Sequence, residues 1–154
     1  RKLLKMRINV IVQDKSWKKY IKNPEAFFEK KTKVLSKNYK PFYKSNLFST
    51  LVLTNSKMIK DLNKKFRKKN KSTDIISFPF YKKSELRRLL KSNKKVYIGD
   101  IVINLNKIKK KDFKKNFNIL WVHGLLHLIG FTHSKDVEYY KMLRLEKKFL
   151  KLIS

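Results

Sequence analysis

Four stretches of the chain have the residue pattern of β-strands. In the first of them, Ile8, Val10 and Val12 alternate with polar residues, so one face of the strand would be apolar. The other three are rich in isoleucine, valine, leucine and threonine, and capping or turn residues separate them. The predicted strands cover residues 6–13, 47–54, 74–80 and 96–105.

Between and after these strands, apolar residues recur at helical spacing. One such stripe runs through Phe27, Phe28 and Leu35, and another runs through Met58, Ile59 and the residues that follow. Residues 107–116 are strongly basic and fit either a helix or a loop. The predicted helices cover residues 24–38, 56–66, 84–91, 119–128 and 135–150, with a short helix at residues 16–21.

Several of these helices are preceded by a polar residue whose side chain can accept hydrogen bonds from the first turn. Asn23 occupies this place before the first long helix, and Asn55 or Ser56 before the next. For the last two helices, the candidate caps are Asn118 and Ser134. The expected starts of all four helices follow from these residues.

The order of elements is strand, helices, strand, helix, strand, strand and then helices. A small mixed sheet covered by helices is the simplest way to pack that order. The 154 residues suit one domain with its own core, and a hydrophobic fraction of 42% excludes a disordered chain. We therefore expect a single α+β domain over residues 1–154, with a four-stranded mixed sheet packed against about five helices.

All three histidines of the chain lie in one short run near its end. His123 and His127 are four residues apart, so on a helix their side chains share one face, with Cβ atoms roughly 5–6 Å apart. Gly130 can adopt the left-handed conformation that ends a helix, which lets the chain turn back and bring in His133. Three protein ligands with an open fourth position are typical of catalytic zinc. We predict one zinc ion at these histidines; the alternative is a set of packed imidazoles with other polar partners.

The spacing of the histidines is that of the metzincin proteases, so the predicted helix at residues 119–128 is a metzincin-like metal helix. The protease motif places a glutamate directly after the first histidine, as the base that takes a proton from the metal-bound water. Here that position is Gly124, which has no proton acceptor in its side chain. A metallopeptidase is therefore a weaker hypothesis than an enzyme for phosphodiesters, whose cleavage needs charge stabilisation and an aligned nucleophile.

The formal net charge of +30 predicts a polyanionic partner, above all nucleic acid. The basic residues are 35 lysines against 6 arginines, and such a bias can also arise from coding sequence rich in adenine and thymine. The few arginines are more informative, because the same bias works against them. Arg67, at the start of a basic loop, is the arginine best placed to bind a phosphate; the alternative is a solvated charge at the end of a helix.

Two of the 11 acidic residues stand within or beside predicted strands. For Asp74, a role as a cap or turn residue after Thr73 is favoured over a catalytic role. Asp100, which follows Gly99, is a candidate hydrogen-bond partner for one of the ligating histidines.

The chain contains no cysteine, which excludes disulfides and thiolate metal sites and fits a reducing compartment. Residues 7–12 are too short and too polar for a signal sequence, and no apolar run approaches the length of a membrane span. We therefore expect a cytoplasmic protein that does not associate with a membrane.

Taken together, these motifs resemble those of the YbeY family of bacterial endoribonucleases. The family signature is His-Gly-x-Leu-His-Leu-x-Gly-Tyr-Asp-His. Further family blocks are Leu-Asn followed by an arginine, Thr-Asp-Val-Leu-Ser-Phe-Pro, Gly-Asp-Ile, and a methionine and a glutamate in the last helix. In family order, the matching residues are 62–67, 73–79, 99–101, the run from His123 to His133, Met142 and Glu146.

The resemblance implies a zinc ion held by His123, His127 and His133, and activity that depends on Arg67. It also implies single-strand-specific cleavage of RNA, in 3′-end maturation of the small-subunit (16S) ribosomal RNA and in ribosome quality control. The implied partners are RNA and the small ribosomal subunit, and the implied fold is a small, mostly parallel sheet with helices. A non-enzymatic RNA- or ribosome-binding protein, stabilised by zinc, is the alternative from another class.

The chain departs from the family pattern at two places. The Tyr-Asp pair before the last histidine is Phe131-Thr132 here, and a threonine can replace only some of the hydrogen bonds of an aspartate. Residues 107–116 also lack the Gln-Ala pattern that is common there in the family.

Overall fold

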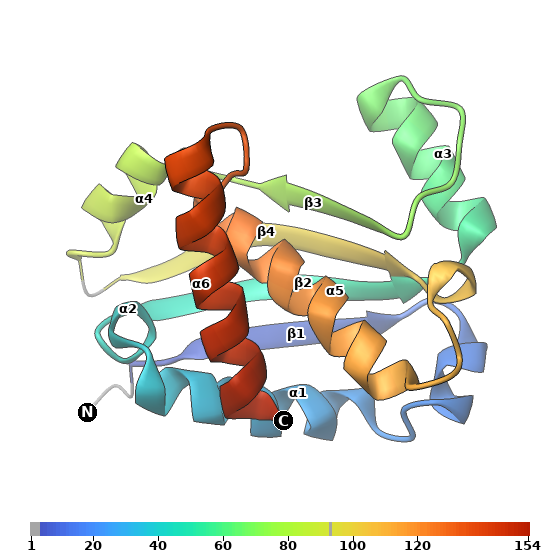
Figure 1. Ribbon diagram of the computed structural model, residues 1–154, viewed down its shortest axis with the longest axis horizontal. Helices are drawn as coiled ribbons and strands as arrows, with labels where there is room; N and C mark the ends of the chain where they lie inside the picture. Colours follow the sequence, from blue (N-terminus) through green and yellow to red (C-terminus); the bar gives the residue numbers. More distant parts are fainter. Residues whose placement is uncertain (1–3, 93) are drawn as a thin grey trace.

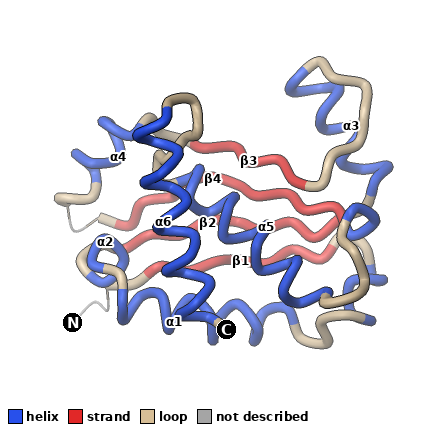
Figure 2. The backbone as a smooth tube through the Cα atoms, viewed as in Figure 1, coloured by secondary structure: helices blue, strands red, loops and turns tan. Residues whose placement is uncertain are grey.

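The computed structural model describes residues 4–92 and 94–154 and contains one four-stranded mixed sheet (Figures 1 and 2). Its strand order is β1-β2-β4-β3. Strands β1, β2 and β4 are parallel to one another, and the edge strand β3 is antiparallel to β4. The strands are β1 (Met6–Val12), β2 (Asn46–Thr54), β3 (Ile75–Pro79) and β4 (Lys95–Asn104), so the α+β class and all four predicted strands are confirmed.

Helices provide the connections that parallel strands require. The long helices were all predicted, although the structure adds a four-residue helix, α2, that is too short to show a periodic pattern. In the described residues, no helix is both long enough and apolar enough to cross a membrane. The helices are α1 (Pro24–Asn38), α2 (Lys40–Tyr43), α3 (Ser56–Arg67), α4 (Lys83–Leu89), α5 (Phe113–Leu128) and α6 (Asp136–Ile153), with short 3₁₀ helices η1 (Lys15–Lys19) and η2 (Leu105–Lys107).

The main core lies between the sheet and helices α1, α5 and α6. Helix α5 packs on β3 and β4, while α6 lies against α5 and reaches α1 (Figure 1). Aromatic side chains fill this layer: Phe28, Phe117 and Trp121 are fully buried. Helix α3 packs against one end of the opposite face, where Ile59 meets Ile76 of β3 and Val102 of β4.

The start predicted for the metal helix is wrong. Helix α5 begins at Phe113, after Asp112, and Asn118 lies inside it, where its side chain accepts a hydrogen bond from the indole of Trp121 at 2.8 Å. Phe113 and Phe117 continue the buried stripe toward the N-terminus. Lysines between these phenylalanines face solvent and obscured the periodicity in the sequence.

Of the other predicted caps, two are confirmed and one is wrong. The Asn23 side chain accepts from Ala26 N, and Asn55, rather than Ser56, accepts from Met58 N, each at 3.0 Å. Ser134, in contrast, does not cap the last helix. Helix α6 begins at Asp136, and the Ser134 hydroxyl bonds Thr132 instead.

We expect the substitution Gly99→Ala to lower the free energy of unfolding by about 3 kcal/mol. Gly99 has a φ of +136° in the bulge of β4, and a Cβ there would overlap the carbonyl oxygen of Phe78. Because that oxygen belongs to the backbone of β3, it cannot move without disturbing the sheet. Chemical denaturation of both proteins measures the loss.

Gly124→Ala is the matched control for this experiment. Its Cβ would meet side-chain methyl groups of Ile75 and Ile101, at 2.9 and 3.0 Å, in a helical conformation that alanine favours. The loss should therefore be clearly smaller. Equal losses for the two variants would show that the backbone conformation of Gly99 is not the cause.

Candidate metal centre

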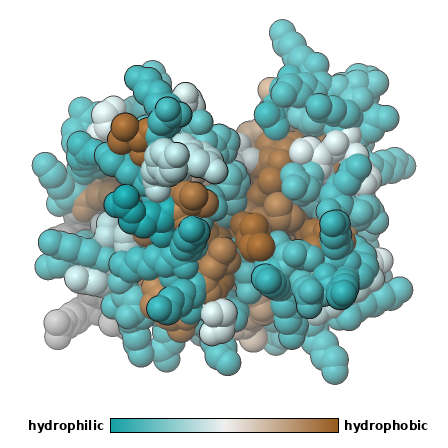
Figure 3. All heavy atoms as spheres, in the orientation of Figure 1, coloured by the Kyte–Doolittle hydropathy of each residue, from teal (hydrophilic) through white to brown (hydrophobic). Residues whose placement is uncertain are grey.

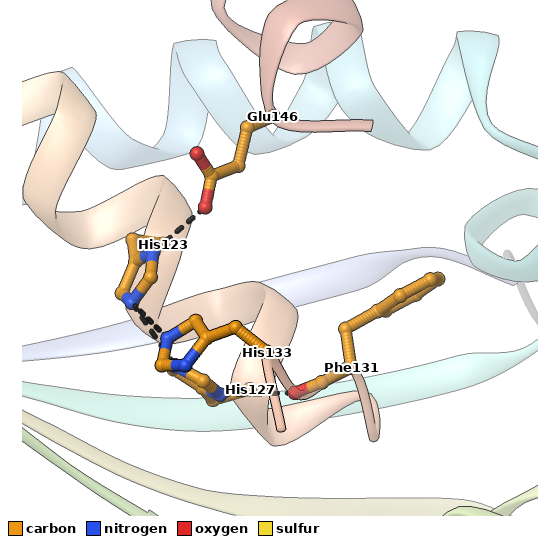
Figure 4. Close-up of polar contacts among 5 residues, drawn as sticks. All are labelled: His123, His127, Phe131, His133 and Glu146. Atoms are coloured by element: carbon orange, nitrogen blue, oxygen red, sulfur yellow. Dashed lines mark hydrogen bonds and ion pairs between the residues drawn. The ribbon is translucent and has the colours of Figure 1, made fainter. Parts of the chain in front are cut away.

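The three predicted ligands meet at one point of the structure (Figure 4). His123 and His127 lie one turn apart on α5, and His133 lies in the loop between α5 and α6. The Nε2 atom of His123 is 3.0 Å from that of His127 and 3.3 Å from that of His133. Zinc–nitrogen bonds of about 2.0–2.1 Å at tetrahedral angles place ligand nitrogens about 3.3 Å apart, so this spacing fits one small ion.

The opposite ring nitrogens of two of these histidines are held by oxygen acceptors. His123 Nδ1 is 2.7 Å from the carboxylate of Glu146 on α6, and His127 Nδ1 is 2.9 Å from the carbonyl oxygen of Phe131. Acceptors at these positions require the proton on Nδ1, which leaves Nε2 as a free lone pair directed at the shared point. The site is therefore arranged for neutral imidazole ligands.

Burial supports the same protonation state at His127. Removal of its ring from water lowers the pKa of His127 below the ordinary value, and the neighbouring His123 lowers it further. The hydrogen bond to the Phe131 carbonyl opposes this effect. The net lowering keeps the ring unprotonated at neutral pH, as a metal ligand must be.

The turn after α5 brings the third histidine back toward the first two. Gly130 has a φ of +100°, and its amide donates to the carbonyl of His127 at 3.1 Å. The next amide, of Phe131, donates to the carbonyl of Leu126 at 3.0 Å. This pair of hydrogen bonds is a Schellman motif, which ends the helix and reverses the chain, as the sequence predicted for Gly130.

Gly124, which replaces the glutamate of the protease motif, lies on the side of α5 that packs on the sheet. A Cβ at this position would contact Ile75, Ile101 and the hydroxyl of Ser77, all on β3 or β4. A glutamate in this orientation would enter the core instead of reaching water at the histidines. The fold therefore offers no place for that base at residue 124.

An open cavity of about 760 Å³ lies beside His127. Its wall contains aromatic rings, three lysines (Lys82, Lys83 and Lys135) and two glutamates (Glu85 and Glu138). The Lys83 ammonium lies 4.8 Å from the centre of the Phe131 ring and 3.5 Å from a carboxylate oxygen of Glu138. Because lysines outnumber glutamates and rings are present, the wall suits a chain that carries both phosphates and bases. Figure 3, which views the helix side, also shows an indentation with hydrophobic atoms at its base between α3 and the rest of the molecule.

Comparison with known proteins identifies the family of this chain. A family model described as "Endoribonuclease YbeY" matches residues 9–154. The chain belongs to the YbeY family. It is 40% identical over 154 residues to the Endoribonuclease YbeY of Pelagibacter ubique, with 96% of each chain covered. The resemblance drawn from the sequence motifs is confirmed.

Two more distant proteins are also similar to this chain. The Endoribonuclease YbeY of Ehrlichia canis is 30% identical, with 93% of this chain and 90% of the relative covered. The solution structure of TM1509 from Thermotoga maritima aligns with a TM-score of 0.61 at 21% identity, over 95% of this chain and 88% of that one. At that identity the second likeness concerns the fold alone, which it confirms.

The other polar residues singled out in the sequence are not among the hydrogen-bond partners of the histidines, which in the described part of the chain are Glu146, the Phe131 carbonyl and one another. Arg67 is the last residue of α3 and is exposed. Asp74 is an exposed turn residue whose carbonyl accepts from the amide of Asn104 at 2.9 Å, in line with its expected structural role. The expectation for Asp100 is wrong, because its carboxylate bonds the hydroxyl of Tyr97 on the opposite face of the sheet.

Glu146 matches the family glutamate, but the sequence alone did not show that its carboxylate bonds the ring of His123.

We expect Glu146→Gln to weaken zinc binding by roughly 10- to 100-fold, because an uncharged acceptor stabilises the ligand tautomer of His123 less well. Competition with a chromophoric chelator measures the affinity. Glu138→Gln is the matched control, since Glu138 also lies on α6 but pairs with Lys83; equal weakening in both variants would contradict the role of Glu146.

Proposed function

We propose that this chain is a zinc-dependent endoribonuclease that cuts single-stranded ribosomal RNA. The proposed role is 3′-end maturation of the small-subunit (16S) RNA and ribosome quality control in the cytoplasm. The observation that carries the proposal is the convergence of three imidazole nitrogens, one from each histidine and within 4.8 Å of one another, in a member of the YbeY family. Imidazole nitrogens in a three-ligand arrangement are the donors that catalytic zinc prefers.

A bound zinc ion supplies charge stabilisation at a phosphate oxygen and acidifies a water molecule. His123, His127 and His133 would hold it, while Glu146 and the Phe131 carbonyl keep the first two rings in the ligand tautomer. The exposed Lys82 and Lys135, on the wall of the adjacent cavity, are placed to attract the RNA backbone. We further propose that Arg67 stabilises the negative charge that builds on the scissile phosphate.

Two other functions are less well supported. A metallopeptidase would need a base after the first histidine, and position 124 faces the sheet. A non-enzymatic RNA- or ribosome-binding protein would use zinc only to hold α5, the following loop and α6 together. The family relatives, named as endoribonucleases, favour the enzyme.

The deciding experiment combines metal analysis with RNA cleavage. The purified protein is analysed for metal by mass spectrometry and then incubated with a single-stranded RNA from the 3′ end of the small-subunit RNA, and with the same segment in a duplex. We expect about one zinc per chain, cleavage of the single strand, loss of cleavage with a chelator and recovery on adding zinc. Zinc without cleavage would favour the binding protein, and cleavage that survives complete removal of metal would contradict the metal-dependent mechanism.

A further inference from the structure

A row of side chains crosses all four strands on the sheet face opposite α5 and α6. In the parallel register, Arg7 of β1 pairs with Phe48 of β2, and Phe48 pairs with Tyr97 of β4. Phe80, directly after β3, continues the row, because its amide bonds Ile98 of β4 at 3.0 Å and its ring meets Tyr97. The row lies near the strand ends drawn at the left of Figure 1, whereas α3 packs near the other end.

The three aromatic rings of this row are in contact with one another. The Phe80 and Tyr97 ring centres are 4.9 Å apart, and those of Tyr97 and Phe48 are 4.8 Å apart, both in edge-to-face geometry. Phe80 is 57% exposed, and Tyr97 and Phe48 are partly exposed. The rings thus form a continuous, solvent-accessible aromatic strip three strands wide.

Positive charge accompanies this strip. The Lys95 ammonium lies 4.4 Å from the centre of the Phe48 ring, and the exposed Arg7 ends the row on β1. Asp100 is the acidic neighbour of the strip, and its carboxylate is bonded to the hydroxyl of Tyr97. Aromatic faces flanked by long basic side chains match the alternation of bases and phosphates in a single nucleic-acid strand.

One end of the strip reaches the cavity that lies beside the candidate metal centre. Phe80 lines the cavity that His127 borders, so this one residue belongs both to the cavity and to the aromatic strip. A strand that leaves the histidines along the cavity therefore reaches the strip by passing around the end of β3.

We propose that the strip formed by Phe80, Tyr97 and Phe48 is a second RNA-binding site, on which unpaired bases stack while Lys95 and Arg7 contact the phosphates. This site gives a basis for single-strand preference, because paired bases cannot leave their own stack to lie on the rings. The proposal takes RNA as the ligand from the proposed function, but it concerns binding and does not depend on cleavage.

The competing explanation is that the rings only stabilise the sheet, as cross-strand aromatic pairs commonly do. The two explanations differ in whether the exposed parts of the rings also bind RNA, for which Lys95 would move from the Phe48 ring to a phosphate. Substitutions that keep apolar bulk but remove the ring therefore separate them, provided that the variants remain folded.

The test measures binding of a fluorescein-labelled 12-nucleotide oligouridylate by anisotropy at fixed salt, with Phe48→Leu and Tyr97→Leu each made in the His127→Ala protein. That background separates binding from cleavage. We expect each leucine variant to bind roughly 5- to 100-fold more weakly than the background, the range for loss of one base–aromatic stack. The control variant Tyr43→Leu should bind within about twofold of the background, because it removes an aromatic side chain that is 44% exposed but lies outside the strip.

Unchanged affinity in both leucine variants would overturn the proposal. An equal loss of affinity for a duplex would also overturn it, since paired bases cannot stack on the rings and the loss would have another cause. Photo-crosslinking of the unsubstituted chain with 5-iodouridine RNA supplies a measurement that does not depend on the folding of a variant. Crosslinks at Phe48 or Tyr97 support the site, and crosslinks confined to the cavity residues, Phe80 included, overturn it.

Discussion

His127→Ala is expected to lose the zinc ion and to reduce RNA cleavage to about one-thousandth of the wild-type rate or less. His127 is one of the three proposed ligands, and its ring centre lies 4.5 Å from that of His123 and 4.8 Å from that of His133. Two remaining imidazoles hold zinc far less tightly than three. Mass-spectrometric zinc content and initial cleavage rates of the two proteins measure the effect.

The control is a substitution on the same helix that removes one hydrogen bond, as His127→Ala does, but leaves all three histidines in place. Asn118→Ala removes the 2.8 Å bond from the Trp121 indole and should lower the free energy of unfolding by about 1 kcal/mol while zinc and cleavage are retained. Retention of one zinc per chain in His127→Ala would place the ion elsewhere. Loss of zinc with unchanged cleavage would leave the metal a structural role only.

The features that could be predicted from the sequence are those that depend on local spacing. Alternation in the first strand and residue composition in the other three located all four strands to within one residue at each end. The interval of four between His123 and His127 predicted a shared helix face. The glycine at residue 130 predicted the reversal that brings His133 to the other two. Each of these inferences uses residues that are close together along the chain.

The features that were missed depend on contacts between distant segments. Glu146 is 23 residues from His123, and only the packing of α6 on α5 brings its carboxylate to the ring. Asp100 was misjudged for a different reason. The register of β2 and β4 shifts between Tyr97 and Gly99, and this bulge puts Tyr97 and Asp100 on the same face, although strict alternation would separate them.

Arg67→Ala is expected to lower the turnover of RNA by roughly 100-fold while it changes the free energy of unfolding by less than about 0.5 kcal/mol. Turnover should fall without a loss of stability, because Arg67 is exposed at the last residue of α3. Removal of its side chain therefore leaves no cavity in the core. Helix α3 stands beyond the edge strand β3 (Figure 1), on one side of the indentation in Figure 3. A guanidinium can form two parallel hydrogen bonds with a phosphate, which is the contact proposed for Arg67.

Two further substitutions separate a specific phosphate contact from the general field of a chain with a net charge of +30. Lys69→Ala removes one exposed positive charge two residues away, and it should leave turnover within about twofold, because one charge among many changes the field little. Arg67→Lys keeps the charge but loses the planar fork, and it should recover only part of the lost turnover. Full activity in Arg67→Lys would show that only the positive charge at residue 67 matters. Equal losses in Arg67→Ala and Lys69→Ala would assign the effect to the basic segment as a whole, and unchanged cleavage in Arg67→Ala would remove the residue from the mechanism.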